Sequence, residues 1–194
     1  MVYQFKIQLK NVNSPKVWRR ILVSSTSTFE EFHRVIQFSF GWKNSHLFFF
    51  SPKGYTSSPI IEMAYKDDFG GNMSGKETLD ATSTLLTDIF VAEKQKYIYL
   101  YDSGDDWFHM LTLEKIWPVE EDKTPVLLAG EGACPPEDCG GTWGYENLKE
   151  ILVDKKHPEH KDMKEWLGLR PREGWNVDAF DMEAQQQILN RMFK

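Results

Sequence analysis

The feature of the sequence that most limits the fold is an aromatic-rich stretch, YIYLYDSGDDWFHMLTLE, at residues 97–114, which we call the aromatic hairpin. Its two halves are rich in residues that favour β-strands, and the turn at Gly104 between them is typical of a tight hairpin. A two-residue turn there predicts a register in which Asp102 lies opposite Trp107 and diagonal to His109. Both faces are largely apolar, so we expect this hairpin inside a covered sheet and not at an exposed edge.

The amino-terminal residues predict a second group of strands. Val2–Leu9 alternates between apolar and polar side chains, and Val17–Val23 follows after a turn-like segment. A helix is then indicated by N-cap candidates at Ser27 and Thr28, by apolar residues at helical spacing, and by Gly41 at its end. With the strand HLFFFS that follows, these elements form a predicted ββαβ unit. We expect this unit to share one sheet with the aromatic hairpin.

The remaining sequence predicts loops, one more strand and several helices. The segments are a mobile loop with one short strand at 54–75, a short helix at 84–90, a polar connection at 115–123 and a strand at 125–128. Helical spacing dominates after the Gly- and Pro-rich turn that follows. The order predicts an α+β fold, with a mainly antiparallel sheet covered by helices. We expect a single domain over residues 1–194, strand-rich in 1–130 and helical in 142–194.

Composition restricts the classes of partner. The formal net charge of −6 opposes non-specific binding to nucleic acid. Lys16, Arg19 and Arg20 lie together, and we interpret them as a solvated strand face with ion pairs to acidic side chains. No apolar run is long enough to cross a membrane, and two cysteines do not make a disulfide framework. We therefore expect a cytoplasmic protein with no membrane partner; a nucleic-acid partner is disfavoured but stays open.

The turn end of the aromatic hairpin gathers Asp102, Asp105, Asp106 and His109. If Asp102 orients the His109 ring, the pair would suit general-base catalysis or a metal site to which the other two aspartates contribute. The alternative is structural, because turn aspartates commonly accept hydrogen bonds from backbone N–H groups. The residues alone favour this structural interpretation.

Cysteine and histidine residues later in the chain resemble a zinc-binding pattern. Cys134 and Cys139 are followed by His157 and His160, and thiolates and imidazoles are the usual ligands of zinc. The spacing between the two histidines is shorter than in the usual motifs, so a solvated helix start is the simpler account of them. Cys134 could also act as a nucleophile or as a metal ligand, although a buried and inert thiol is the commoner state.

The segment PPEDCGGTWGY places acidic residues among aromatic ones. We expect Trp107, Trp143 and Tyr145 to be buried and to hold this segment against the aromatic hairpin, because aromatic side chains beside Gly-rich turns commonly anchor them. Glu137 and Asp138 would then join the hairpin aspartates in a polar cleft with an aromatic floor. The predicted ligand-binding residues are therefore Glu137, Asp138, Trp107, Trp143 and Tyr145.

Several stretches together resemble one family, the plasmid pRiA4b ORF-3-like proteins. They are YQFKIQLKNVNSPKVWRRI, GWKNSHL, YDSGDDWFHMLTLE, ACPPEDCGGTWGY and FDMEAQQQIL, in this order along nearly the whole chain. Ser103 and Cys139 stand where the family usually has Phe and Val, and the second departure weakens any role that needs both cysteines. The resemblance implies a compact α+β fold and an intracellular bacterial or archaeal setting, with some members on plasmids or mobile elements, but no established activity.

The sequence therefore favours a domain that binds a protein partner or a small ligand. One alternative is a metal-assisted hydrolase that uses the hairpin from Asp102 to His109. Another is a nucleic-acid accessory factor, which only the plasmid association of the relatives suggests. A divalent metal ion is the cofactor that the pattern would hold, and its candidate ligands are His109, Asp105, Asp106 and Cys134.

Overall fold

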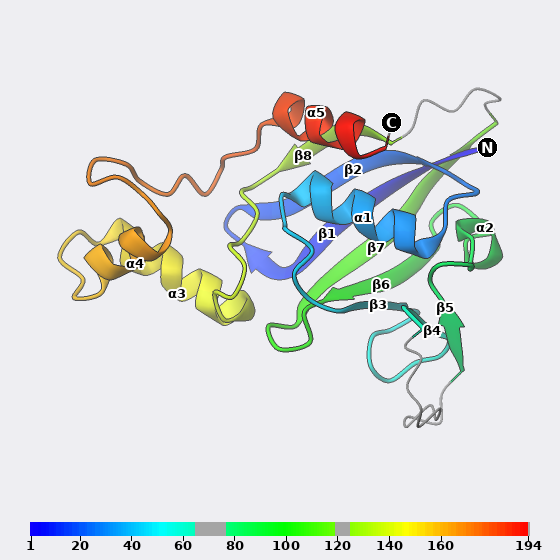
Figure 1. Ribbon diagram of the computed structural model, residues 1–194, viewed down its shortest axis with the longest axis horizontal. Coiled ribbons are helices and arrows are strands. Elements are labelled where there is room, and N and C mark those ends of the chain that lie inside the picture. Colours follow the sequence, from blue (N-terminus) through cyan, green and yellow to red (C-terminus); the bar gives the residue numbers. More distant parts are fainter. Residues whose placement is uncertain (65–76, 119–124, 194) are drawn as a thin grey trace.

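The computed structural model describes residues 1–64, 77–118 and 125–193 of the chain (Figure 1). Within these residues, eight strands form one sheet in the order β5-β4-β3-β6-β7-β1-β2-β8. Neighbouring strands are antiparallel except β4 and β5, which are parallel. The strands are β1 (Val2–Asn13), β2 (Lys16–Ser24), β3 (Phe48–Ser51), β4 (Ile60–Glu62), β5 (Thr78–Asp80), β6 (Lys96–Tyr101), β7 (Trp107–Trp117) and β8 (Val126–Glu131). The helices are α1 (Phe29–Phe40), α2 (Leu86–Ile89), α3 (Gly141–Val153), α4 (His160–Trp166) and α5 (Met182–Met192). The predicted α+β fold with a mainly antiparallel sheet is confirmed.

The aromatic hairpin forms β6 and β7 in the middle of the sheet, where β7 also pairs with β1. It therefore shares one sheet with the amino-terminal strands, as predicted. The predicted register is wrong by one residue, because Tyr101 and not Asp102 lies opposite Trp107. The connecting loop runs from Asp102 to Asp106, and these two residues have positive φ angles of 56° and 55°. Because this loop is longer than a two-residue turn, the side chains of the two strands pair differently.

Helix α1 covers the central strands on one face of the sheet. Its start is set by a capping box, in which Thr28 and Glu31 each accept a hydrogen bond from the other's backbone N–H. It ends at Gly41, whose φ of 111° suits a glycine. Phe32 on its buried face packs against Phe5 of β1, with ring centres 4.8 Å apart. This aromatic packing holds α1 against the sheet.

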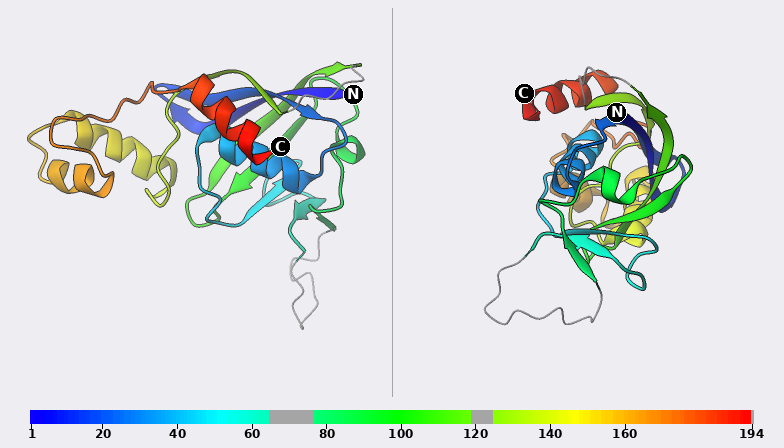
Figure 2. Two further views of the ribbon diagram at one scale, coloured as in Figure 1. Left: turned by 45° about the horizontal axis from the view of Figure 1, so that its top comes forward. Right: turned by 90° about the vertical axis from the view of Figure 1, so that its right-hand side faces the viewer.

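Helix α5 packs on α1 and on the edge strand β8, and Figure 2 shows α1 and α5 on the same side of the sheet. Asp181 caps α5, since its side chain accepts a hydrogen bond from the Ala184 N–H at 2.9 Å. Gln186 of α5 then bonds to the edge strand, because its Oε1 accepts from the Leu127 N–H at 2.6 Å and its Nε2 donates to the Pro125 carbonyl at 3.1 Å. These bonds satisfy backbone groups that an open edge would offer to another chain.

Arg19 of β2 lies in the core. It is only 1% exposed, so the prediction of a solvated basic face is wrong at this position. Its guanidinium donates hydrogen bonds to the carbonyl oxygens of Ser39, Glu131 and Gly132 at 2.9, 2.8 and 3.0 Å. Alternate residues of β2 face the core, and the planar fork of an arginine can satisfy its donors there with carbonyl groups. Arg20 faces the other side and pairs with Glu114, as the solvated-face interpretation expected.

Helices α3 and α4 extend beyond the end of the sheet that carries the loop between β6 and β7 (Figure 1). Lys149 fastens α3 to the sheet, because its Nζ donates to the Ser14 carbonyl at 2.9 Å in the turn between β1 and β2. Tyr145 is fully buried at the base of α3, as predicted. Trp143 is 88% exposed, so the prediction that it is buried is wrong. The two residues are two positions apart on one helix and therefore face different directions.

Two predicted segments lie partly outside the described residues. These parts are residues 65–75 of the predicted mobile loop and residues 119–123 of the predicted polar connection. The short strand expected near Ile60 is present as β4, and β7 continues to Trp117, further than predicted. In the part of the chain that the structure describes, no helix is long and apolar enough to cross a membrane.

Candidate functional site

A closed ring of hydrogen bonds holds the loop after α1, residues 41–47, which we call the GWKNSHL loop. Gln37 Nε2 donates to the Tyr99 hydroxyl at 2.8 Å, and His33 Nδ1 lies 2.8 Å from the same hydroxyl. His33 Nε2 is 2.6 Å from Asn44 Oδ1, and the Asn44 N–H donates to Gln37 Oε1 at 3.1 Å. Because Asn44 Oδ1 can only accept, the imidazole proton of His33 lies on Nε2, and Nδ1 accepts from the Tyr99 hydroxyl. Burial lowers the pKa of His33 to about 4, so this ring is neutral at neutral pH and orients the loop.

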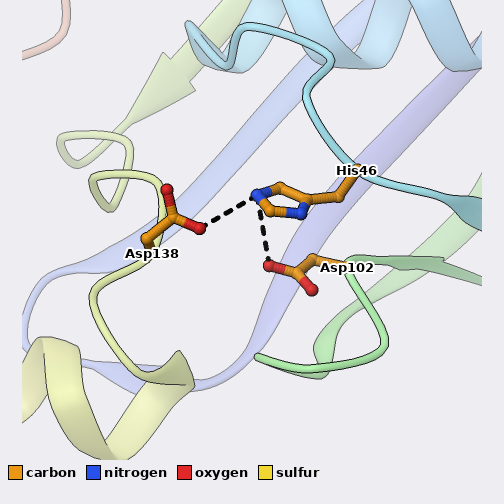
Figure 3. A group of neighbouring side chains, drawn as sticks. All are labelled: His46, Asp102 and Asp138. Atoms are coloured by element: carbon orange, nitrogen blue, oxygen red, sulfur yellow. Dashed lines mark ion pairs between the residues drawn. The ribbon is translucent and has the colours of Figure 1, made fainter.

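The GWKNSHL loop brings His46 to the end of the sheet, where three acidic side chains surround its ring. The Nε2 atom of His46 is 3.1 Å from an oxygen of Asp138, 3.6 Å from one of Asp102 and 3.8 Å from one of Glu137. Figure 3 shows the ring between Asp102 and Asp138. This nitrogen has no exposed surface and makes no hydrogen bond. We call His46, Asp102, Glu137 and Asp138 the acid–imidazole cluster.

Asp102 is positioned by the end of β6. Its positive φ of 56° turns the chain out of the strand. One carboxylate oxygen, Oδ1, accepts hydrogen bonds from the N–H groups of Gly104 at 2.9 Å and Asp105 at 3.4 Å. The structural role expected for a turn aspartate is therefore present. The other oxygen, Oδ2, is the one that faces His46.

Glu137 and Asp138 come from the loop between β8 and α3, residues 132–140, which contains the PPED sequence and which we call the PPED loop. The Glu137 carboxylate accepts hydrogen bonds from the Lys43 N–H at 2.9 Å and from the Tyr101 hydroxyl at 3.1 Å. Burial, together with the charge of Glu137, raises the pKa of Tyr101, so its hydroxyl stays protonated and donates. Asp138 has a φ of 57° and a side chain that is 71% exposed. The cluster is thus anchored on the Glu137 side and open on the Asp138 side.

The hairpin turn and the PPED loop meet, as predicted. The Gly140 N–H donates to Asp105 Oδ2 at 3.1 Å. Gly141 lies so close to the same residue that an added Cβ would be 2.3 Å from the Asp105 carbonyl oxygen. The cavities described next to Glu137 and Asp138 are lined by the GWKNSHL loop, the PPED loop, α3, α4 and Trp175, and not by the hairpin aspartates. The cleft therefore has different walls from the one that the sequence predicted.

His109 is part of the core and not of this cluster. It is 0% exposed, and its ring makes edge-to-face contacts with Phe40 and Trp42, with both pairs of ring centres 5.1 Å apart. Burial lowers its pKa to about 3, so the ring is neutral. The predicted pairing with Asp102 depended on the register that is wrong. The position of His109 therefore gives no support to a general-base pair.

The other candidates from the sequence occupy different surroundings. Asp106 accepts a hydrogen bond from the Tyr55 hydroxyl. Trp107 is fully buried, as predicted, and packs on Trp42 with ring centres 5.9 Å apart. Burial raises the pKa of the Cys134 thiol, and it raises that of Cys139 to about 12. Because the thiolate is the nucleophile and the metal ligand, burial disfavours both roles for these cysteines.

The donor atoms of the cluster have a spacing that suits a metal ion. Among the described residues, those of His46, Asp102 and Asp138 lie within 4.8 Å of one another. Nitrogen and oxygen ligands bind zinc at about 2.0–2.2 Å, so two ligands of one ion lie about 3–3.5 Å apart. The distances of 3.1 and 3.6 Å from His46 Nε2 are close to this spacing. Three such ligands with one open side are also the arrangement that catalytic metal sites use.

His46 is the residue that sequence reasoning missed. We expected it at the start of a strand, but β3 begins at Phe48 and His46 stays in the loop. Its one signal was its place in GWKNSHL, a stretch that carries the family resemblance. Its acidic neighbours are distant in sequence, and only the fold brings them to it.

Comparison with known proteins identifies the family. Residues 1–184 match the family described as plasmid pRiA4b ORF-3-like protein. The uncharacterized protein y4hQ of Sinorhizobium fredii (strain NBRC 101917 / NGR234) is 34% identical over 168 residues, which cover 86% of this chain and 81% of that protein. The crystal structure of MM3350 from Methanosarcina mazei Go1, a protein of unknown function, has a TM-score of 0.78 and 32% identity, and the match covers 94% of this chain and 96% of that one. The chain therefore belongs to the plasmid pRiA4b ORF-3-like family.

Proposed function

We propose that this protein is a ligand-binding domain whose site is built around a divalent cation held by His46, Asp102 and Asp138. The observation that carries the proposal is the position of His46 Nε2, which has no exposed surface and no hydrogen bond but has two carboxylate oxygens at 3.1 and 3.6 Å. A buried polar atom that makes no hydrogen bond is costly. One cation between these groups would satisfy the nitrogen and both carboxylates together.

The donor set narrows the choice of cation. An imidazole nitrogen with carboxylate oxygens suits zinc and manganese better than the softer ions that prefer sulfur. Glu137 would act as a support, because its carboxylate already accepts hydrogen bonds from Tyr101 and from the Lys43 N–H. Binding requires a neutral imidazole and ionised carboxylates, so protons compete with the cation and affinity falls in acid.

A metal-assisted hydrolase is the second candidate, and the 71% exposure of the Asp138 side chain favours it. An ion at the cluster would face solvent on that side, where a bound water would become more acidic. Hydrolysis of p-nitrophenyl phosphate and p-nitrophenyl acetate with Mn²⁺ tests this candidate, with His46→Gln as the inactive comparison. The nucleic-acid alternative lacks such support, since Arg19 is buried and Arg20 is paired with Glu114.

Calorimetric titration with Mn²⁺ and Zn²⁺ tests the cation site itself. We expect one ion per chain for the unaltered protein and a loss of affinity of about tenfold or more for His46→Gln and Asp138→Asn. Asp106→Asn is the matched control, because it alters an aspartate of the same hairpin loop that bonds instead to Tyr55. Absence of uptake, or equal uptake by His46→Gln, would mean that a cation is not part of the site.

A further inference from the structure

A cleft lined by both tryptophan and charged side chains opens beside the acid–imidazole cluster. Its volume is about 420 Å³, and its lining includes Trp42, Lys43, Pro136, Asp138, Trp166 and Trp175. These residues come from the GWKNSHL loop, the PPED loop, the end of α4 and the segment between α4 and α5. The volume of the cleft is within the range of about 300–1,000 Å³ that is typical of small-molecule sites.

The cleft and the cluster share two acidic residues. Glu137 and Asp138 line the cleft, and Asp138 is also the residue whose carboxylate lies 3.1 Å from His46 Nε2. A cation held by His46, Asp102 and Asp138 would therefore lie at the border of the cleft. A ligand in the cleft could reach the open side of that cation.

The walls of the cleft favour an aromatic ring, and its rim favours an oxyanion. Trp166 is 48% exposed although it is a large aromatic residue, and it lines both this cleft and a smaller cavity of about 230 Å³ that also contains Asp138. The exposed face of a tryptophan favours contact with a flat ring. At the rim, Lys43 supplies a positive charge, and a divalent cation with open coordination positions takes oxygen ligands.

We propose that the cleft binds a small oxyanion that carries an aromatic ring, with the oxyanion on the cation and the ring against Trp166. This inference rests on the proposed cation site and adds the chemical class of its ligand. A carboxylate and a phosphate monoester present the same chemistry to the cation, so both belong to the class. The cleft is too small to hold a whole macromolecule. It can hold a ring-bearing oxyanion that is either free or attached to a larger molecule.

Titration of the Mn²⁺-loaded protein, followed by tryptophan fluorescence and calorimetry, tests the inference. The probes are phenyl phosphate and benzoate, which distinguish the two oxyanions. Inorganic phosphate and acetate represent the oxyanion half without a ring, and phenol represents the ring half without an oxyanion. We expect at least one ring-bearing oxyanion to bind about tenfold or more tightly than either half, and to lose this advantage without Mn²⁺.

Two tryptophan variants test whether the aromatic ring of the ligand binds against Trp166. Trp166→Ala should lower the affinity for the ring-bearing oxyanion about tenfold and leave Mn²⁺ uptake unchanged. Trp143→Ala is the matched control, because Trp143 is 88% exposed on the same helical extension and does not line the cleft. Mn²⁺ uptake without binding of either oxyanion, binding that is equal without Mn²⁺, or full affinity in Trp166→Ala would each overturn this inference alone. Absence of Mn²⁺ uptake would overturn it together with the proposed cation site.

Discussion

The guanidinium carbon of Arg19 lies 4.0 Å from the centre of the Phe180 ring, in the interior of the protein. Phe180 belongs to the segment that leads into α5, and it comes this close because residue 130 of β8 is a glycine. A Cβ on Gly130 would lie 2.6 Å from the Phe180 ring. Burial lowers the pKa of Arg19 to about 10, so the group is still charged at neutral pH. One buried cation thus joins β2, α1, β8 and the approach to α5.

Removal of the Arg19 donors should destabilise the whole fold. Arg19→Met keeps most of the side-chain length but leaves the carbonyl oxygens of Ser39, Glu131 and Gly132 without their donor. We expect the free energy of unfolding in urea to fall by about 2–5 kcal/mol. Arg20→Met is the matched control, because a partly exposed ion pair contributes only about 0–1 kcal/mol. Equal losses for the two variants would contradict the central role of Arg19.

Two tryptophans that the sequence predicts to be buried should differ sharply in their effect on stability. Trp107 is 0% exposed and Trp143 is 88% exposed. Trp107→Ala should lower the free energy of unfolding by about 3–5 kcal/mol, as for other buried aromatics. Trp143→Ala should change it by no more than about 0.5 kcal/mol. A large loss for Trp143→Ala would show that this side chain is covered in solution.

Two glycines with the same backbone conformation separate the effect of strain from that of a steric clash. Gly141 and Gly168 have φ angles of +67° and +68°, but a Cβ on Gly141 would lie 2.3 Å from the Asp105 carbonyl oxygen, whereas one on Gly168 would have no neighbour within 4 Å. Gly168→Ala should cost about 1–2 kcal/mol from the left-handed conformation alone. Gly141→Ala should cost more and should also weaken Mn²⁺ binding, because it pushes the PPED loop away from the hairpin. Equal effects would show that the two loops do not need this close approach.

Acid should destabilise the protein partly through two buried histidines. Burial lowers the pKa of His33 to about 4 and that of His109 to about 3, whereas a histidine in an unfolded chain has a pKa of about 6.5. Between these values the unfolded state binds protons that the folded state does not. The two histidines therefore do not lower the free energy of unfolding above about pH 6.5, and they lower it progressively as the pH falls below that value. Each histidine contributes about 1.4 kcal/mol per pH unit to this slope.

Urea unfolding between about pH 6.5 and pH 4.5 measures that slope. His109→Phe keeps an aromatic ring against Phe40 and Trp42 and should make the slope shallower by about 1.4 kcal/mol per pH unit. A variant with the slope of the unaltered protein would show that His109 becomes protonated in the folded state.

Part of the candidate site was visible in the sequence. Asp102, Glu137 and Asp138 were expected near one another because their two loops are separated by little intervening structure, and consecutive elements are usually neighbours. His46 was not expected there, since its loop is far away in sequence and no local pattern marks it. His109 was assigned to the site instead, because the assumed turn was too short. The conformation of that turn depends on left-handed backbone angles at Asp102 and Asp106, which propensity does not specify.

The sequence by itself determined the elements whose causes are local. The capping box of Thr28 and Glu31, the glycine at the end of α1 and the Asp181 cap of α5 each depend on residues within a few positions, and alternation along β1 depends only on the period of a strand. The tertiary structure alone decided which side chains meet across the sheet. The burial of Arg19, the exposure of Trp143 and the position of His46 among three carboxylates depend on segments that are distant in the chain. Their contacts arise from the packing of α1, the PPED loop and the β6–β7 loop against one another, and no short window of sequence contains all the groups involved.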